Sequence, residues 1–229
     1  PYDPDWLVII DGVGDTLLRK VRMRGSPTRM AYNATINKLY VVCTDDCMIR
    51  VYDGATDTLM AEVWFGESNT PYTILWHPAS NRVFCTTECD ASTDTTFVID
   101  CQADELVERN PTGPHPYAMC SNPDNNLVYV AANAGIVVLS ARGDTVLDTI
   151  PAYAGEMCFV PYPNKLYAVY FWTYVIDCDL NSVTESLPFS ASATVCDTVH
   201  GKVYNAARPN AFVLDARGDS LVTAIPDGS

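Results

Sequence analysis

The sequence is poor in lysine, in histidine and in long apolar runs. Its 229 residues include only four lysines and three histidines, and the formal net charge is −14. A negative field of this size opposes binding to a phosphate backbone, so we predict no nucleic-acid partner. No apolar run approaches the roughly 18 residues that a transmembrane helix needs, so we predict no insertion into a membrane.

What the sequence does contain is an internal repeat. A motif of the form Val/Ile-x-Asp-x-x-x-Asp occurs six times, with some drift, at spacings of 37 to 47 residues. Its residue pairs are Asp11/Asp15, Asp53/Asp57, Asp100/Asp104, Ser140/Asp144, Asp177/Asn181 and Asp215/Asp219. A period near 40 in a chain without helical patterning is typical of β-propellers, whose blades take about 40 to 50 residues each.

A second motif ends in an aromatic residue and alternates with the first. Each copy follows a turn rich in Asn, Pro, Asp or Gly, and the copies end at Tyr40, Phe84, Tyr129, Tyr167 and Tyr204. Between the two motifs lie short alternating or β-branched runs, which suit half-buried strands. One repeat therefore holds four strands, here called a to d in chain order, with the aromatic motif in strand b and the Asp motif between c and d.

These repeats predict an all-β fold, a β-propeller of four-stranded antiparallel blades. We expect a single domain over residues 1–229, with an orphan c–d pair near 6–25 and five full repeats near 26–68, 69–113, 114–153, 154–189 and 190–229. The expected plan has six blades, the sixth either incomplete or completed by polypeptide outside this chain, because exposed sheet edges need a partner. A closed ring of five blades is the alternative.

The repeats resemble the YVTN class of β-propeller repeats, which is related in plan to the NHL and WD-repeat propellers. The resemblance is carried by Pro116, the turn Asn122-Pro123-Asp124-Asn125, the strand motifs Leu127-Val128-Tyr129-Val130 and Val98-Ile99-Asp100, and the segment from Thr145-Val146 to Ile150-Pro151. YVTN-like propellers resemble parts of larger surface-layer and exported polypeptides. The resemblance therefore implies an extracellular, cell-surface or periplasmic protein.

The first residues do not resemble a signal peptide, because Pro1 to Asp5 lack a basic region before an apolar stretch. The chain begins inside a repeat and without methionine. We therefore expect a processed protein or a part of a longer polypeptide, whose remaining parts are candidate partners.

Nine cysteines are the most unusual part of the composition. Two pairs, Cys43 with Cys47 and Cys85 with Cys89, lie in b–c hairpins as Cys-x-x-x-Cys, and we expect disulfides there, more firmly for the first pair. Such bonds favour an oxidising compartment. A zinc site at the same thiols fits the spacing poorly. Three further cysteines lie in strand a, where small buried residues are expected, and these are Cys120, Cys158 and Cys196.

The repeated Asp pairs allow two interpretations. Carboxylates suit Ca²⁺, but each Asp-x-x-x-Asp segment spans a c–d hairpin, where Asp side chains accept bonds from turn amides. We favour turn chemistry. No catalytic constellation is visible, because the three histidines fall in different repeats, and we predict no metal site and no cofactor.

The starts of the inner strands offer a candidate ligand site at the propeller axis. Tyr72 and Tyr117 occupy equivalent places after a proline, and Arg29 and Glu156 occupy the next place in their own repeats. We predict an axial mouth formed by these four residues; simple packing between blades is the competing interpretation.

Two classes of function fit these features. The preferred one is a non-catalytic binding or scaffold propeller that presents its loops and axial mouth to a protein or glycan. The alternative is an enzyme or redox protein with a metal or cofactor on the axis, by analogy with lactonase and dehydrogenase propellers.

Overall fold

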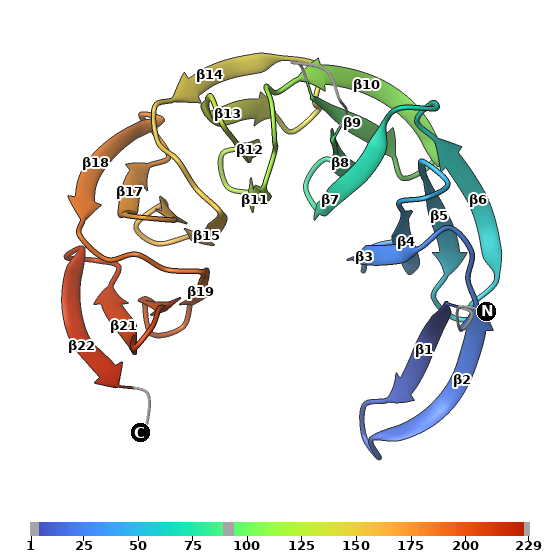
Figure 1. Ribbon diagram of the computed structural model, residues 1–229, viewed down its shortest axis with the longest axis horizontal. Coiled ribbons are helices and arrows are strands. Elements are labelled where there is room, and N and C mark those ends of the chain that lie inside the picture. The colour runs from blue at the N-terminus through green and yellow to red at the C-terminus, as the bar shows by residue number, and fades with distance from the viewer. Residues whose placement is uncertain (1–4, 89–93, 227–229) are drawn as a thin grey trace.

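The protein is described by a computed structural model that covers residues 5–88 and 94–226. Within these ranges all regular structure is β-strand, and the 22 strands form one two-stranded sheet and five four-stranded antiparallel sheets (Figure 1). The predicted all-β propeller with five full repeats and an orphan pair is confirmed. The described residues contain no helix of the length and apolarity required to cross a bilayer.

The hairpin and the first two blades follow the repeat boundaries expected from the motifs. The hairpin consists of β1 (Trp6–Asp11) and β2 (Thr16–Arg22). Blade 1 contains β3 (Pro27–Asn33), β4 (Lys38–Cys43), β5 (Met48–Asp53) and β6 (Leu59–Trp64). Blade 2 contains β7 (Thr70–His77), β8 (Arg82–Glu88), β9 (Thr95–Asp100) and β10 (Glu105–Pro111).

The remaining three blades repeat the same order. Blade 3 contains β11 (Ala118–Asn122), β12 (Leu127–Ala132), β13 (Gly135–Ser140) and β14 (Val146–Ile150). Blade 4 contains β15 (Glu156–Val160), β16 (Lys165–Val169), β17 (Thr173–Asp177) and β18 (Ser182–Leu187). Blade 5 contains β19 (Ala193–Asp197), β20 (Lys202–Ala206), β21 (Asn210–Asp215) and β22 (Ser220–Pro226).

The Asp motif forms the turn between strands c and d. Asp53 is representative: its Oδ1 accepts bonds from the amides of Ala55 at 2.9 Å and Thr56 at 2.8 Å, an Asx turn. The second residue of the motif has a positive φ, 56° at Asp57 and 56° at Asp104, a conformation that Asp and Asn tolerate better than most residues. The turn interpretation of these carboxylates is therefore confirmed at Asp53.

Strand a is the innermost strand of each blade, and strand d is the outermost (Figure 1). The inner strands β3, β7, β11, β15 and β19 neighbour one another along the arc. The apolar core lies between consecutive blades and is divided among five clusters, one at each junction. Burial of these faces against neighbouring blades, at about 25 cal/mol per Å² of apolar surface, supplies the main stabilisation.

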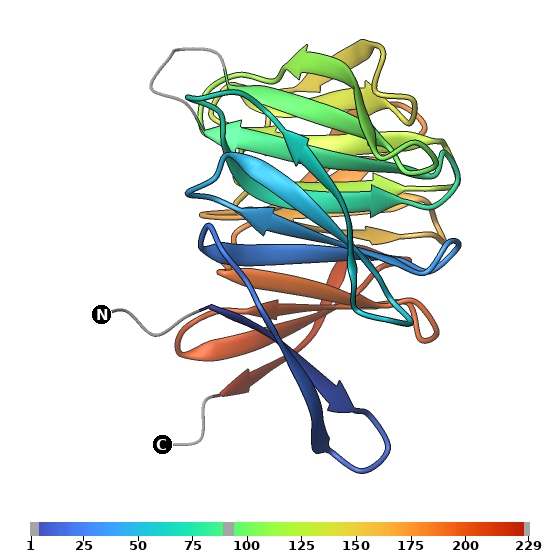
Figure 2. The same cartoon turned by 90° about the vertical axis from the view of Figure 1, so that its right-hand side faces the viewer.

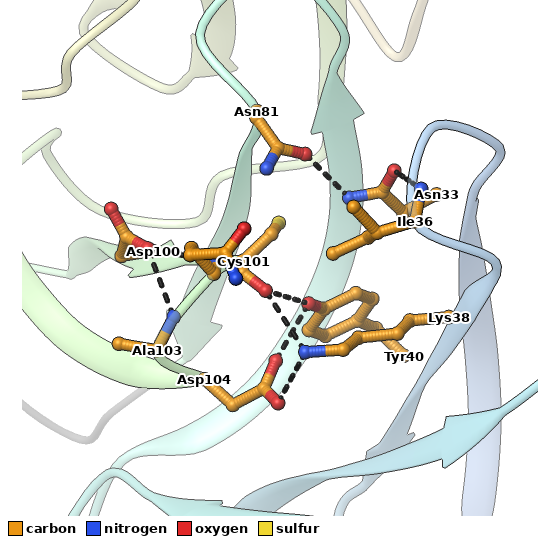
Figure 3. A network of polar contacts seen from close by, with 10 residues as sticks. Asn33, Ile36, Lys38, Tyr40, Asn81, Asp100, Cys101, Ala103 and Asp104 are labelled. Carbon is orange, nitrogen blue, oxygen red and sulfur yellow. Dashed lines mark hydrogen bonds and ion pairs between the residues drawn. The ribbon is translucent and has the colours of Figure 1, made fainter.

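The two sequence motifs meet between blades. Tyr40 of blade 1 donates a 2.9 Å hydrogen bond to Oδ1 of Asp104 in blade 2, and Lys38 forms a 2.6 Å ion pair with Oδ2 of the same carboxylate (Figure 3). A second side-chain hydrogen bond links the same two blades: Nδ2 of Asn33 donates to Oδ1 of Asn81 at 2.7 Å. The two motifs alternate along the chain but meet in space, because strand b of one blade faces the c–d turn of the next. We call this contact the joint between two blades.

The same joint recurs at two further junctions. Tyr129 donates to Oδ1 of Asn181 at 2.9 Å, and Tyr167 donates to Oδ1 of Asp219 at 2.6 Å. The junction of blades 2 and 3 differs because Phe84 has no hydroxyl group. There Phe84 makes an apolar contact, and Asp144 accepts a 2.7 Å bond from Ser140 within its own turn. The c–d turn of blade 3 is bonded to blade 2 through its backbone instead, since Arg82 donates to the carbonyl of Arg142 and Asn110 to that of Gly143.

The five full blades form an open arc (Figure 1). The hairpin β1–β2 packs beside blade 1, where Leu7 and Val21 contact the cluster around Met23 and Val41, and blade 5 lies at the other end of the arc. The alternative expectation of a closed five-blade ring is therefore wrong for the described residues. We expected the hairpin to lie between blades 1 and 5; it packs against blade 1 but not against blade 5 in the described residues.

Candidate functional site

An aromatic cleft of about 650 Å³ opens between blades 3 and 4. We use this name for the cavity lined by Tyr117, Ala132, Asn133, Tyr153, Ala154, Gly155, Tyr170, Phe171, Trp172 and Tyr174. These residues come from the start of strand a, the b–c turns and the link between the blades. All three kinds of segment lie at the same end of the strands, since strand a starts where strand b ends.

Backbone hydrogen bonds hold the segments that line the cleft. The amide of Tyr170 donates to the carbonyl of Trp172 at 3.0 Å, which closes the b–c turn of blade 4. The amide of Gly155 donates to the carbonyl of Val169 at 2.9 Å, and the amide of Ala191 donates to the carbonyl of Tyr170 at 3.0 Å. The turn is therefore anchored both to its own blade and to the start of blade 5.

The rings of the cleft are large and exposed, and two of them are in contact with each other. Tyr170 and Phe171 have ring centroids 4.2 Å apart at 57°, and Phe171 is 72% exposed. Trp172 is 47% exposed and Tyr153 is 59% exposed. Rings with this exposure leave apolar surface in water that a ligand could cover, and Tyr and Trp also offer a polar tip.

Gly155 fixes the position of one of these rings. A Cβ atom at residue 155 would lie 3.3 Å from Cδ2 of Tyr170, which is tighter than an ordinary van der Waals contact. The ring of Tyr170 can pack over the backbone here because the residue beneath it has no side chain.

The polar groups of the cleft carry no formal charge. None of the ten lining residues is Asp, Glu, Lys, Arg or His. Tyr117 donates a 2.9 Å hydrogen bond to Oδ1 of Asn133, which orients the amide of Asn133 and leaves its nitrogen as a donor. The site therefore suits an uncharged ligand with apolar faces and some hydrogen-bonding groups.

Of the four residues predicted for an axial mouth, two are in contact with each other and the other two lie apart from them. The guanidinium carbon of Arg29 lies 5.3 Å from the ring centre of Tyr72, a cation–π contact between blades 1 and 2. Tyr117 lines the aromatic cleft instead. Glu156 is exposed at the first position of β15, and the described residues include no ion pair between it and Arg29. A single mouth made of all four residues stays a prediction.

A histidine connects the cleft to blade 2. The ring of His115 stacks on Tyr117 with centroids 6.4 Å apart, and its Nδ1 lies 3.3 Å from Oε1 of Glu88. Its backbone amide donates a 2.8 Å bond to Oδ2 of Asp94. Tyr117 is therefore held by a ring contact with His115 and by its hydrogen bond to Asn133.

The cleft was not identified from sequence, although a signal for it exists. Tyr170, Phe171, Trp172 and Tyr174 are four aromatic residues within five positions, and they fall at a b–c turn. A run of this kind is usually found inside a strand. Because this one falls at a turn, its rings are expected to be exposed. Among the described residues no group of three or more His, Cys, Asp or Glu side chains has an arrangement that could hold a metal ion.

The expected disulfide between Cys43 and Cys47 is wrong. Both thiols are free, because Cys43 ends β4 and pairs across the hairpin with Met48, whereas Cys47 lies in the turn with φ 51°. Burial raises the pKa of the Cys43 thiol. Cys85 is also free and buried in the middle of β8, while Cys89, its expected partner, lies outside the described residues.

The cysteines of strand a are small residues on the inner strands, as expected. Cys120 and Cys158 are buried, and Cys196 is half-buried. Cys158 and Cys196 lie on the neighbouring inner strands β15 and β19, and the interaction between their thiols raises the pKa of Cys158 and lowers the pKa of Cys196 to about 7. Sγ of Cys196 also lies 2.9 Å from the carbonyl oxygen of Phe159.

Comparison with known proteins supports the fold and says little about function. No family model matches the chain, and no curated protein matches it. Among solved structures, Kuenenia stuttgartiensis hydrazine synthase is similar, with a TM-score of 0.71 at 15% sequence identity, over 89% of this chain and 66% of that one. At this identity the likeness shows the fold alone, and the chain spans less than two thirds of the length of that neighbour.

Proposed function

We propose that this propeller is a non-catalytic binding module, and that its aromatic cleft holds an uncharged segment of a protein or glycan. The observation that carries the proposal is the convergence of Tyr153, Tyr170, Phe171 and Trp172, all exposed, on one cavity. A volume of about 650 Å³ falls within the range of about 300 to 1,000 Å³ that is usual for ligand pockets.

The chemistry of the cleft favours binding over catalysis. Its rings supply contact area at low conformational cost, and Trp and Tyr are the residues that most often dominate binding energy. Apart from its tyrosine phenols, its lining contains no acidic, basic or thiol side chain that could transfer a proton or attack a substrate. The alternative, an enzyme or redox protein with a metal or cofactor on the propeller axis, needs a site other than this cleft. Measurement of bound metal and of visible absorbance in the purified protein tests that alternative.

A location outside the cytoplasm remains part of the proposal, and it now rests on the resemblance to YVTN-type repeats. The free thiols of Cys43, Cys47 and Cys85 remove the argument from disulfides.

The binding proposal is tested by screening the protein against a peptide array and a glycan array and measuring the affinity of each hit by calorimetry. Trp172→Ala should weaken binding about tenfold or more, the usual consequence of truncating an aromatic anchor. The matched control is Trp64→Ala on the outer strand β6, because Trp64 is also exposed, at 58%, but lies outside the cleft.

Two results would contradict the proposal. One is the absence of any ligand on either array that Trp172→Ala weakens. The other is an equal loss of binding in Trp172→Ala and Trp64→Ala, which would point to a general loss of folded protein instead of a site.

A further inference from the structure

Two cysteine side chains meet at the junction of blades 4 and 5. Cys158 lies in β15 and Cys196 in β19, the innermost strands of two blades that follow one another along the arc (Figures 1 and 2). Cys158 is a buried member of the apolar cluster at this junction, and the half-buried Cys196 packs against the same cluster. The pair therefore arises from the packing of two blades and not from a Cys-x-x-x-Cys hairpin.

Each thiol reaches the strand that carries the other. Sγ of Cys196 lies 2.9 Å from the carbonyl oxygen of Phe159, the residue that follows Cys158. Sγ of Cys158 lies 3.3 Å from Oγ1 of Thr194. Because side chains two positions apart lie on the same face of a strand, Thr194 and Cys196 share one face of β19. Both sulfur atoms are therefore directed into the space between β15 and β19.

The two thiols differ in the way that thiol–disulfide exchange requires. The interaction with Cys158 lowers the pKa of Cys196 to about 7, and an attacking thiol works best when its pKa lies near the ambient pH. The same interaction, together with burial, raises the pKa of Cys158. Cys196 is also the more accessible of the two. These differences make Cys196 the attacking thiol and Cys158 the resolving one.

The junction of blades 3 and 4 provides a matched comparison. Cys120 occupies in β11 the place that Cys158 occupies in β15, since each pairs across its sheet with the tyrosine of strand b. Phe159 occupies in β15 the place of Cys196 in β19, since each pairs with the residue before that tyrosine. Where Cys158 has a thiol in the next blade, Cys120 thus has a phenylalanine.

We propose that Cys158 and Cys196 form a redox-active dithiol that reacts with low-molecular-weight disulfides and becomes a disulfide bond between blades 4 and 5. The structure describes the reduced form, in which both thiols are free. The Cys196 thiolate first attacks one sulfur of the small disulfide, so that a mixed disulfide forms and one small thiolate leaves. Cys158 then loses its proton and attacks Sγ of Cys196, and the second small thiolate leaves. The two cysteines lose two electrons and two protons, and the small disulfide is reduced to two thiols.

Oxidation of the reduced protein tests the proposal. The protein is reduced, freed of reductant and incubated at neutral pH with glutathione disulfide, and iodoacetamide in denaturant then labels the thiols that remain. The wild type should lose two labelled cysteines. Peptide mass spectrometry without reductant should find the peptides of Cys158 and Cys196 joined. A wild-type protein that keeps both thiols, or that joins other cysteines, would overturn the proposal.

Three variants separate the two steps. Cys158→Ser should stop at the mixed disulfide, so that Cys196 gains one glutathionyl group, which dithiothreitol removes. Cys196→Ser should gain no such group at Cys158, because that thiol is buried and its pKa is raised. Cys120→Ser is the matched control and should form the Cys158–Cys196 bond as the wild type does.

Circular dichroism checks that each variant is folded, and the joined peptides of the wild type give a result that needs no variant. Equal glutathionyl labelling in Cys158→Ser and Cys196→Ser would contradict the assigned roles. Loss of the Cys158–Cys196 bond in a folded Cys120→Ser protein would contradict a dithiol made of these two residues alone.

Discussion

The phenol of Tyr40 donates a 2.9 Å hydrogen bond to Asp104, a residue 64 positions later in the sequence and one blade further along the arc. Tyr40 is fully buried, and burial followed by the hydrogen bonds near Cys101 and Asp104 raises the pKa of its phenol. The phenol therefore stays protonated and acts only as a donor. Because the same carboxylate also pairs with Lys38, blade 1 is joined to blade 2 by a small polar network inside an apolar interface.

Deletion of one tyrosine hydroxyl should destabilise the protein where that hydroxyl is buried and hydrogen-bonded, and should have little effect where it is exposed. We predict that Tyr40→Phe lowers the free energy of unfolding by about 1.5 to 3 kcal/mol, because it deletes a buried bond to a charged group. Tyr204→Phe, the same change at an exposed position of the same motif, should lie within about 0.5 kcal/mol of wild type. Urea denaturation at low protein concentration measures both. Equal effects at the two positions would contradict the joint as described.

The blade order was predictable because the signals for it are local and repeated. Each Asp pair marks a turn through its own side-chain chemistry, so Asp53 could be assigned without knowing its neighbours. The partner of Tyr40 could not, since Asp104 lies in another blade and only the packing of blades brings the two together. Cys43 shows the same limit: Cys-x-x-x-Cys spacing allowed a disulfide, but the register places Met48 opposite Cys43.

The aromatic cleft depends on the absence of a side chain at Gly155. We predict that Gly155→Ala displaces the ring of Tyr170, because the added Cβ would lie 3.3 Å from that ring, and weakens ligand binding about threefold to tenfold. Stability should change little, since φ at Gly155 is not in the left-handed region. Calorimetry with an array hit measures the affinity, and Gly12→Ala, where nothing lies within 4 Å of the new atom, is the control. Unchanged affinity in Gly155→Ala would remove Tyr170 from the binding surface.

The thiols offer a chemical check on the redox state. We predict that at least eight of the nine cysteines react with iodoacetamide in denaturant without reductant, because eight are free in the described residues. In the folded protein Cys196 should react before Cys158, since it is half-buried and its pKa is lowered to about 7, and the thiolate is the reactive form. Peptide mass spectrometry locates the label. Fewer than eight labelled cysteines before reduction would restore a disulfide to the protein.

Acid should weaken the fold through the Asx turns. Hydrogen bonds from Thr56 and Ala55 lower the pKa of Asp53 in the folded state. A lowered folded pKa gives stability that is fully present above the unfolded value of about 3.9 and is lost as the pH falls through the folded value. Asp53→Asn keeps an oxygen that can accept the turn amides but cannot titrate. We therefore predict that the urea midpoint falls less between pH 7 and pH 3 in Asp53→Asn than in the wild type. The control is Glu67→Gln, since Glu67 is exposed and has no hydrogen bond in the described residues; this variant should keep the wild-type pH dependence. An equal fall of the urea midpoint in all three proteins would show that the turn carboxylate does not contribute.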